Sequence, residues 1–234
     1  MPLSLRRSHR HPGRRLVRLL FLCLGLLLFG HLAANWDMDR VLSSAQSRYG
    51  ALGSAQERLQ AWAQLLQTSA RQDEQQQLET VNRFFNRQLA FRDDRAIWNQ
   101  ADYWATPVES LVKGAGDCED FALAKYFSLR QLGVPAERLR ITYVKSLKLN
   151  QAHMVLSYYV SDSSDPLVLD NLIDEILPAS QRRDLLPVYA FNAEGLFLVE
   201  PFTGAITRGD PKQLSRWQGV LRKMRGEGLD VGAG

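Results

Sequence analysis

Cysteine and histidine are scarce in this chain of 234 residues, which holds only 2 Cys and 4 His. Two cysteines cannot form a framework of disulfides, and without any Cys-x-x-Cys pair they cannot supply a four-thiolate zinc site. Charged residues make up 23% of the chain, which excludes a multi-span membrane protein, and a hydrophobic content of 45% is enough for one substantial core or two small ones.

Acidic residues are absent from the first eighteen positions, where six arginines gather. An uncharged stretch of eleven residues, 19–29, follows, and it is shorter than the roughly 20 residues that a membrane-spanning helix requires. A basic flank followed by a short apolar stretch is typical of an export signal. We therefore predict an export signal over residues 1–34, cleaved after Ala34, and a single domain over residues 35–234. Because Leu32 fits the cleavage pattern poorly, an uncleaved inner-membrane anchor is the alternative, and it is the only membrane contact we expect.

Removing this leader changes the balance of charge and the supply of reactive side chains. The whole chain has 29 Lys and Arg against 25 Asp and Glu, so the loss of six arginines leaves 23 basic residues and a net charge of about −2. No basic run remains that would favour nucleic-acid binding. One thiol, Cys118, and one imidazole, His153, also remain, which is too few for a zinc site built on three or four His or Cys ligands.

The spacing of apolar residues predicts helices first and strands second. Helical spacing covers residues 37–48, a segment beginning at the capping-box pair Ser54 and Glu57, residues 73–88, a short helix over 107–113, and a helix from Asp117 to Gly133. Residues 91–106 read as irregular. Alternating patterns then predict strands near 139–143, 154–160 and 167–169, the last two forming a hairpin, and a second hairpin joins 187–191 to 196–199. With a closing helix over 212–225, this order predicts an α+β fold with an antiparallel sheet.

Cys118 lies where a glycine turn becomes a helix. The free backbone amides and the positive end of the helix dipole at that position favour a thiolate and can receive an oxyanion, so Cys118 is a candidate nucleophile. His153 is the only imidazole left to act as its base, and Asp170, across the predicted hairpin, could orient that imidazole. Each residue also has a plain structural alternative: a buried cysteine, a core histidine and an aspartate that ends a strand.

Three carboxylates, Asp117, Glu119 and Asp120, surround Cys118 in sequence. They would raise the pKa of the thiol by like-charge repulsion, and a bound cation would relieve that conflict. Carboxylate oxygens suit Ca²⁺ better than transition metals, although the spacing is not that of an EF-hand. The alternative is that Asp117 caps the helix and its neighbours are solvated.

Several stretches between residues 80 and 200 resemble one family, the bacterial transglutaminase-like cysteine proteinases. They are 81–86 (VNRFFN), 102–107 (DYWATP), 116–121 (GDCEDF), 125–126 (KY), 152–156 (AHMVL), 169–171 (LDN) and 187–192 (PVYAFN). The resemblance implies a papain-like transglutaminase core in which Cys118 is the nucleophile, His153 the base and Asp170 the orienting residue. It also implies dependence on Ca²⁺, with Asp117 and Glu119 as ligands and Asp120 as a third candidate.

The same resemblance implies a biological role. Members of the family act in the periplasm, where they cleave a very large surface adhesin near its N-terminus at a pair of alanines, which releases the adhesin and disperses a biofilm. A cyclic-di-GMP-sensing receptor in the inner membrane sequesters the protease when the nucleotide is abundant. Two other functions stay open from the residues alone: a protein-glutamine acyl transferase, and a catalytically inert receptor-binding module.

Overall fold

The computed structural model describes residues 36–161, 164–199 and 206–229. The predicted export signal over residues 1–34 lies outside this part of the chain, so it stays a prediction, as does the single domain over 35–234. Among the described residues, no helix is both long enough and apolar enough to cross a bilayer.

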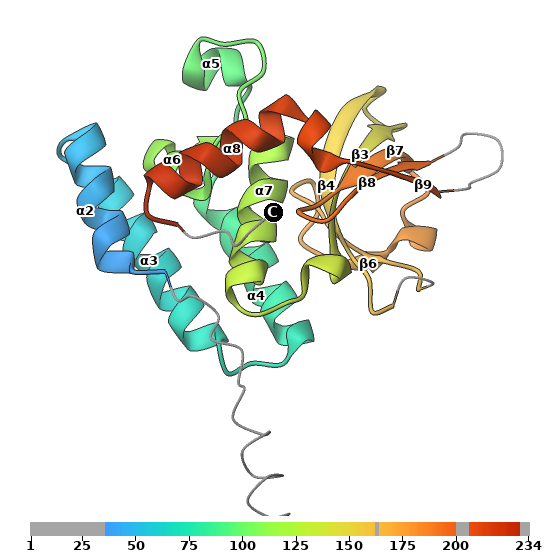
Figure 1. Ribbon diagram of the computed structural model, residues 1–234, viewed down its shortest axis with the longest axis horizontal. Coiled ribbons are helices and arrows are strands. Elements are labelled where there is room, and N and C mark those ends of the chain that lie inside the picture. Colours follow the sequence, from blue (N-terminus) through green and yellow to red (C-terminus); the bar gives the residue numbers. More distant parts are fainter. Residues whose placement is uncertain (1–35, 162–163, 200–205, 230–234) are drawn as a thin grey trace, which may run out of the picture. The chain divides into compact units, whose positions relative to one another are not determined.

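Helices make up most of the first half of the described chain, and all the strands of the main sheet lie in the second half (Figure 1). The α-helices are α2 (Met38–Tyr49), α3 (Ser54–Ser69), α4 (Glu74–Gln88), α5 (Asp94–Trp98), α6 (Pro107–Lys113), α7 (Cys118–Gln131) and α8 (Ser215–Gly226), and the 3₁₀ helices are η2 (Ala136–Arg138), η3 (Ala179–Gln181) and η4 (Pro211–Gln213). The order of elements confirms the predicted α+β class.

The main sheet is antiparallel throughout and has the order β6-β5-β4-β3-β7-β8-β9 in the described residues. Its strands are β3 (Leu139–Ser146), β4 (Gln151–Tyr158), β5 (Leu167–Leu169), β6 (Leu177–Pro178), β7 (Leu185–Phe191), β8 (Leu196–Val199) and β9 (Ile206–Gly209). Both predicted hairpins are confirmed, since β4 pairs with β5 and β7 with β8. A separate parallel pair, which the sequence did not indicate, joins β1 (Ala90–Phe91) to β2 (Ala115–Gly116).

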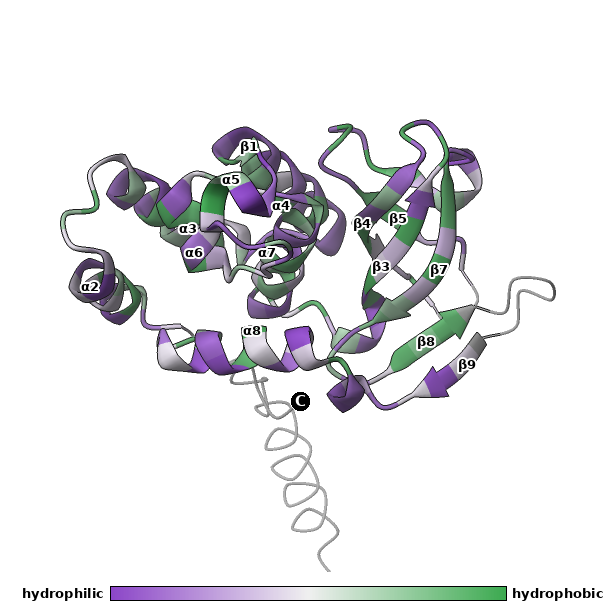
Figure 2. Ribbon diagram, turned by 90° about the horizontal axis from the view of Figure 1, so that it is seen from above, coloured by the Kyte–Doolittle hydropathy of each residue, from purple (hydrophilic) through white to green (hydrophobic). Residues whose placement is uncertain are grey.

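Helix α7 lies between the other helices and the sheet (Figures 1 and 2). Every residue from 120 to 129 is buried, which is typical of a helix that packs on all sides rather than on one face. On one side it packs against β4, and on the others against α4 and α6. The helix ends as predicted, because Gly133 takes a positive φ of 96° before Pro135. The residue that begins this helix, Cys118, is thereby placed at the start of a helix that is buried on all sides.

Two helix starts differ from the sequence expectation. The capping box predicted at Ser54 and Glu57 is wrong: Gly53 is the N-cap of α3, and the Ser54 hydroxyl instead accepts a hydrogen bond from Arg58, 3.2 Å away. A complete capping box occurs at α6, where the Thr106 hydroxyl accepts from the Glu109 amide at 3.1 Å and the Glu109 carboxylate accepts from the Thr106 amide at 3.0 Å. This box fixes the end of the segment that leads into the site.

The segment expected to be irregular, residues 91–106, contains the short helix α5. Its buried residue Asp94 accepts a hydrogen bond from the Tyr103 amide, which closes the loop that follows the helix. Asn99 ends α5 in the left-handed conformation with a φ of 55°. Five residues are too few for a periodic pattern to show, which is why the sequence did not reveal this helix.

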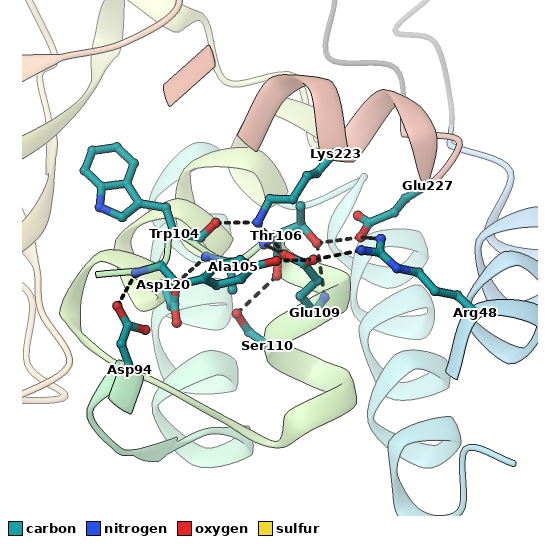
Figure 3. Close-up of polar contacts among 11 residues, drawn as sticks. Arg48, Asp94, Trp104, Ala105, Thr106, Glu109, Ser110, Asp120, Lys223 and Glu227 are labelled. Atoms are coloured by element: carbon teal, nitrogen blue, oxygen red, sulfur yellow. Dashed lines mark hydrogen bonds and ion pairs between the residues drawn. The ribbon is translucent and has the colours of Figure 1, made fainter. Parts of the chain in front are cut away.

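A buried polar network ties α8 to the other helices (Figure 3). The Glu109 carboxylate accepts from Lys223 of α8 at 2.6 Å and faces Arg48 of α2 at 3.4 Å. Glu227, just after α8, accepts from the Thr106 hydroxyl at 2.9 Å. Because its members come from both ends of the described chain, this network holds the last helix across the helical layer.

Candidate active site

Cys118 is the first residue of α7, and its N-cap, Asp117, has extended backbone. The approach to the helix is tight, because a Cβ on Gly116 would lie only 2.7 Å from the Cβ of Asp120. A glycine at 116 therefore allows the chain to pass close to the first turn before the helix begins. This geometry directs the backbone amides of the first turn toward the region of the thiol.

His153 and Asp170 form the hydrogen-bonded pair that the hairpin predicted. His153 lies on β4 and Asp170 directly follows β5, and the two strands are paired with Leu156 opposite Leu169. Nε2 of His153 is 2.8 Å from Oδ1 of Asp170, and both side chains are buried. Burial alone would raise the pKa of Asp170, but hydrogen bonds from His153, the Leu172 amide and Arg182 lower it to about 2. Asp170 is thus a stable carboxylate, and Nδ1 is the ring nitrogen of His153 left for another partner.

Cys118 and His153 line the same cavity, whose volume is about 640 Å³. The sulfur of Cys118 also accepts a hydrogen bond from the backbone of Met154, the residue next to His153. Aromatic side chains of Trp104, Tyr143 and Tyr189 line the cavity. The structure therefore places the predicted thiol and imidazole on one cavity and joins the predicted carboxylate to that imidazole by a hydrogen bond.

Residues of the last helix complete the cavity. Leu214, Ser215 and Arg216 contribute to its lining, and Arg216 forms an ion pair with Asp102 on the opposite side. The cavity is consequently assembled from the helical layer, from the sheet and from the start of α8.

A cluster of carboxylates adjoins the thiol. Oxygens of Asp94, Asp117 and Glu119 all lie within 4.8 Å of one another. Burial, with the charges of Glu119 and Asp120, raises the pKa of Asp117 to about 10. Oδ1 of Asp94 and Oδ1 of Asp117 are buried and accept no hydrogen bond from the described residues. Three carboxylates held this close repel one another, and the charge of Arg216 opposes this repulsion only in part, at Asp94.

The same cluster acts on the thiol. Burial raises the pKa of Cys118, and the charge of Glu119 and a 3.1 Å hydrogen bond from the thiol to Glu119 raise it further. The hydrogen bond from the Met154 backbone opposes this increase. A positive charge placed among the carboxylates would therefore favour the thiolate.

The donor set fits a hard divalent cation such as Ca²⁺. All the candidate ligands are carboxylates, and buried oxygens of Asp94 and Asp117 lack hydrogen-bond donors. Asp117 and Glu119 were the predicted ligands, and Asp94 joins them. Asp120 lies outside this group: its Oδ1 accepts from the Ala105 amide at 2.7 Å, while its buried Oδ2 accepts no hydrogen bond from the described residues. Its role as a ligand stays a prediction.

Sequence reasoning missed three residues that shape the site. Asp94 comes from a helix too short to recognise. Asn86 of α4 donates from Nδ2 to the backbone carbonyl of Asp170 and to Asp174, each at 2.9 Å, and so fixes the turn after β5. Arg182 donates to Oδ2 of Asp170 at 2.7 Å. Asn86 lies in the stretch 81–86 that carried the family resemblance, so this stretch signalled its importance, although not its contact.

Comparison with known proteins identifies the family of the chain. A family model described as bacterial transglutaminase-like cysteine proteinase matches residues 54–183. No curated protein matches the chain significantly.

Solved structures of Legionella pneumophila LapG are similar to this chain over most of its length. One is 45% identical, with a TM-score of 0.70, and the match covers 81% of this chain and 98% of that one. An EGTA-treated form has a TM-score of 0.71 over the same shares at the same identity. A calcium-bound form is 45% identical, with a TM-score of 0.68, and the match covers 80% of this chain and 98% of the other. The chain belongs to the bacterial transglutaminase-like cysteine proteinases.

Proposed function

We propose that this chain is a calcium-dependent cysteine endopeptidase in which Cys118, His153 and Asp170 form the catalytic triad. The observation that carries the proposal is the convergence, on one cavity, of a thiol at a helix start and a buried His153–Asp170 pair. The family match supports cysteine protease activity, and the existence of calcium-bound and EGTA-treated LapG structures supports a role for Ca²⁺.

The residues perform acyl transfer to water in two stages. His153 takes the proton of the Cys118 thiol, and the sulfur attacks the peptide carbonyl, while the backbone amide of Cys118 stabilises the oxyanion. His153 then gives the proton to the leaving amine, and a thioester remains. A water molecule, deprotonated by His153, attacks the thioester and releases the acid and the thiol. Asp170 holds the imidazole by Nε2 throughout, which directs Nδ1 to the thiol.

Asp94, Asp117 and Glu119 would hold the calcium ion. When bound, the ion supplies positive charge that offsets the three carboxylates and favours the Cys118 thiolate. The ligands come from α5 and from the residues that flank Cys118, so filling the site also fixes the loop before α6 against the start of α7.

The substrate and setting follow from the family resemblance. We propose that the enzyme works in the periplasm and cleaves the N-terminal region of a large surface adhesin at a pair of alanines, promoting biofilm dispersal. The periplasmic domain of a cyclic-di-GMP receptor of the inner membrane restrains it. The basic, apolar leader over residues 1–34 supports export independently of this resemblance.

The decisive experiment incubates the protein with an N-terminal adhesin fragment that contains a di-alanine site. We expect cleavage in calcium, none in excess EGTA, and none with Cys118→Ala, while Ser47→Ala, a control at an exposed serine of α2, cleaves at the parental rate. Cleavage by Cys118→Ala near the parental rate would refute the triad, and full activity in EGTA would refute the calcium requirement. Incorporation of a primary-amine probe would identify acyl transfer instead, and a Cys118 that iodoacetamide labels only slowly would indicate an inert binding module.

A further inference from the structure

The second oxygen of Asp170 is held by a buried arginine. Oδ1 accepts from Nε2 of His153 at 2.8 Å and from the Leu172 amide at 3.0 Å, while Oδ2 accepts from Nη2 of Arg182 at 2.7 Å. Both partners of this ion pair are nearly inaccessible, with side-chain exposures of 5% for Arg182 and 0% for Asp170. With donors on both oxygens, the carboxylate cannot rotate without breaking a charged, buried hydrogen bond.

Arg182 is itself held in place by a second carboxylate. Its Nε donates to Oδ1 of Asp184 at 3.0 Å and its Nη2 to Oδ2 at 2.9 Å, a two-point contact that fixes the plane of the guanidinium. The backbone supports this arrangement, because Arg182 follows η3 and its carbonyl accepts from the Leu185 amide at the start of β7. The chain Asp184–Arg182–Asp170–His153 thus runs from β7 to the imidazole.

The charges around Asp170 come from several elements. His153 faces it from β4, and Arg182 faces it from the segment after η3. Lys125 of α7 interacts through space with the charges of Asp170 and Asp174. Burial lowers the pKa of Lys125 to about 7, and its Nζ has no hydrogen-bond partner among the described residues. Burial alone would lower the pKa of Arg182, but the hydrogen bonds to Asp184 and Asp170 raise it. Arg182 is therefore the cation that stays charged beside Asp170 at every pH of interest.

Arg182 does not line the cavity that holds Cys118 and His153. It lines a different cavity, together with the small apolar cluster of Val144, Val155 and Val168. Any effect of Arg182 on the reaction must therefore pass through Asp170 and not through contact with substrate.

We propose that Arg182, anchored by Asp184, is a positioning residue that fixes the orientation and the ionised state of Asp170 and thereby the imidazole of His153. This inference rests on the proposed function, because it assigns Arg182 a role in that reaction. If the inference is correct, the geometry of the catalytic triad depends on Arg182 and Asp184 as well as on its own three members.

The test compares Arg182→Gln with Arg183→Gln in the full chain with calcium and the adhesin fragment. Arg183 is the exposed neighbour, so the control removes the same charge one position away. We expect Arg182→Gln to lower kcat by about 10- to 100-fold with KM changed less than about twofold, as for a small displacement of a catalytic group. Its acid-side inflection in kcat/KM should move to higher pH, because Asp170 loses the cation that keeps it ionised. Arg183→Gln should stay within about twofold of the parent.

Two further variants keep the inference testable if Arg182→Gln does not fold. Arg182→Lys keeps the charge without the two-point contact, and Asp184→Asn keeps the arginine without its anchor; each should lower kcat by about 3- to 10-fold at unchanged KM. Thermal unfolding shows which variants are folded. If Arg182→Gln is folded and has the parental kcat and pH profile, or if it is unfolded and the other two variants have the parental kcat, the inference is wrong while the protease remains. If the parent does not cleave the fragment, the proposed function fails and this inference fails with it.

Discussion

Asp117 and Asp170 are two aspartates of one site, and their pKa values are shifted in opposite directions. The pKa of Asp117 is raised to about 10 by burial and by the charges of neighbouring carboxylates. The pKa of Asp170 is lowered to about 2, although burial acts against it as well. The difference lies in their partners: Asp170 has His153 and Arg182, whereas Asp117 has Glu119 and Asp94.

The comparison shows which charge the protein supplies for itself. Around Asp170 the fold brings its own cation, so this half of the site is complete within the chain. The groups that act on Asp117 most strongly are carboxylates, an arrangement that a cation from solution would stabilise. Under the proposed function, folding alone therefore sets the charge balance around Asp170, whereas the balance around Asp117 would also depend on a cation from solution.

We expect the largest effect from replacing Asp170, whose negative charge is compensated by His153 and Arg182. Asp170→Asn should lower kcat/KM by about 10⁴-fold, because an amide can hold the imidazole in the wrong tautomer. Measurement of kcat/KM on the adhesin fragment checks this, with the exposed Glu175→Gln as a control for a lost negative charge nearby. A loss smaller than tenfold in Asp170→Asn would mean that Asp170 does not orient the base.

We expect a smaller effect, on thermal stability, from Asp117→Asn. Its sign should differ between EGTA and calcium. In EGTA at pH 7, Asp117→Asn should raise Tm by about 2 to 5 °C, because Asp117, with its pKa raised to about 10, must take up a proton on folding and the amide need not. In calcium the same variant should unfold below the parent, since the parent gains more from binding the ion.

Scanning calorimetry in the two conditions checks the reversal, and Asp39→Asn, an exposed aspartate in the first turn of α2, is the matched control with no dependence on calcium. If Asp117→Asn destabilises the protein equally in both conditions, Asp117 is a structural cap and not a ligand.

A third effect, similar in size to the second but confined to high pH, concerns a carboxyl group whose pKa lies between those of Asp117 and Asp170. Burial raises the pKa of Glu227 to about 7 from 4.5; the Thr106 hydrogen bond and the charges of Arg48 and Lys223 oppose this change, and that of Glu109 adds to it. The folded state binds a proton more tightly than the unfolded state, so Glu227 costs stability as pH rises from 4.5 through 7.

Glu227→Gln should therefore raise the free energy of unfolding at pH 8 by about 1 to 3 kcal/mol and leave it nearly unchanged at pH 4.5. Urea unfolding at both values measures this, with the exposed Glu137→Gln as a control. An equal change at the two pH values would show that hydrogen bonding, and not ionisation, sets the effect.

The sequence predicted the parts of the site that depend on local patterns. The glycine turn and the helix start located Cys118, and the alternation of apolar residues placed His153 and Asp170 on paired strands. The sequence could not predict the place of Asp94, because α5 has too few residues to show a period. It could not predict the role of Arg182, because the partners of Arg182 depend on how the loop after η3 returns to the sheet. The misplaced capping box shows the same limit: Ser54 has the right spacing, but a long-range arginine contact to α6 places Arg58 beside it.

The position of α8 in the chain determines when the cavity can be completed during synthesis. Residues 213–216 line the cavity, yet they are among the last of the described chain to be synthesised. A chain that emerges from the N-terminus can form α7 and the β4–β5 hairpin early, but it cannot close the wall of its own substrate cavity until Arg216 meets Asp102. The cavity is therefore complete only when nearly all of the described chain has been synthesised.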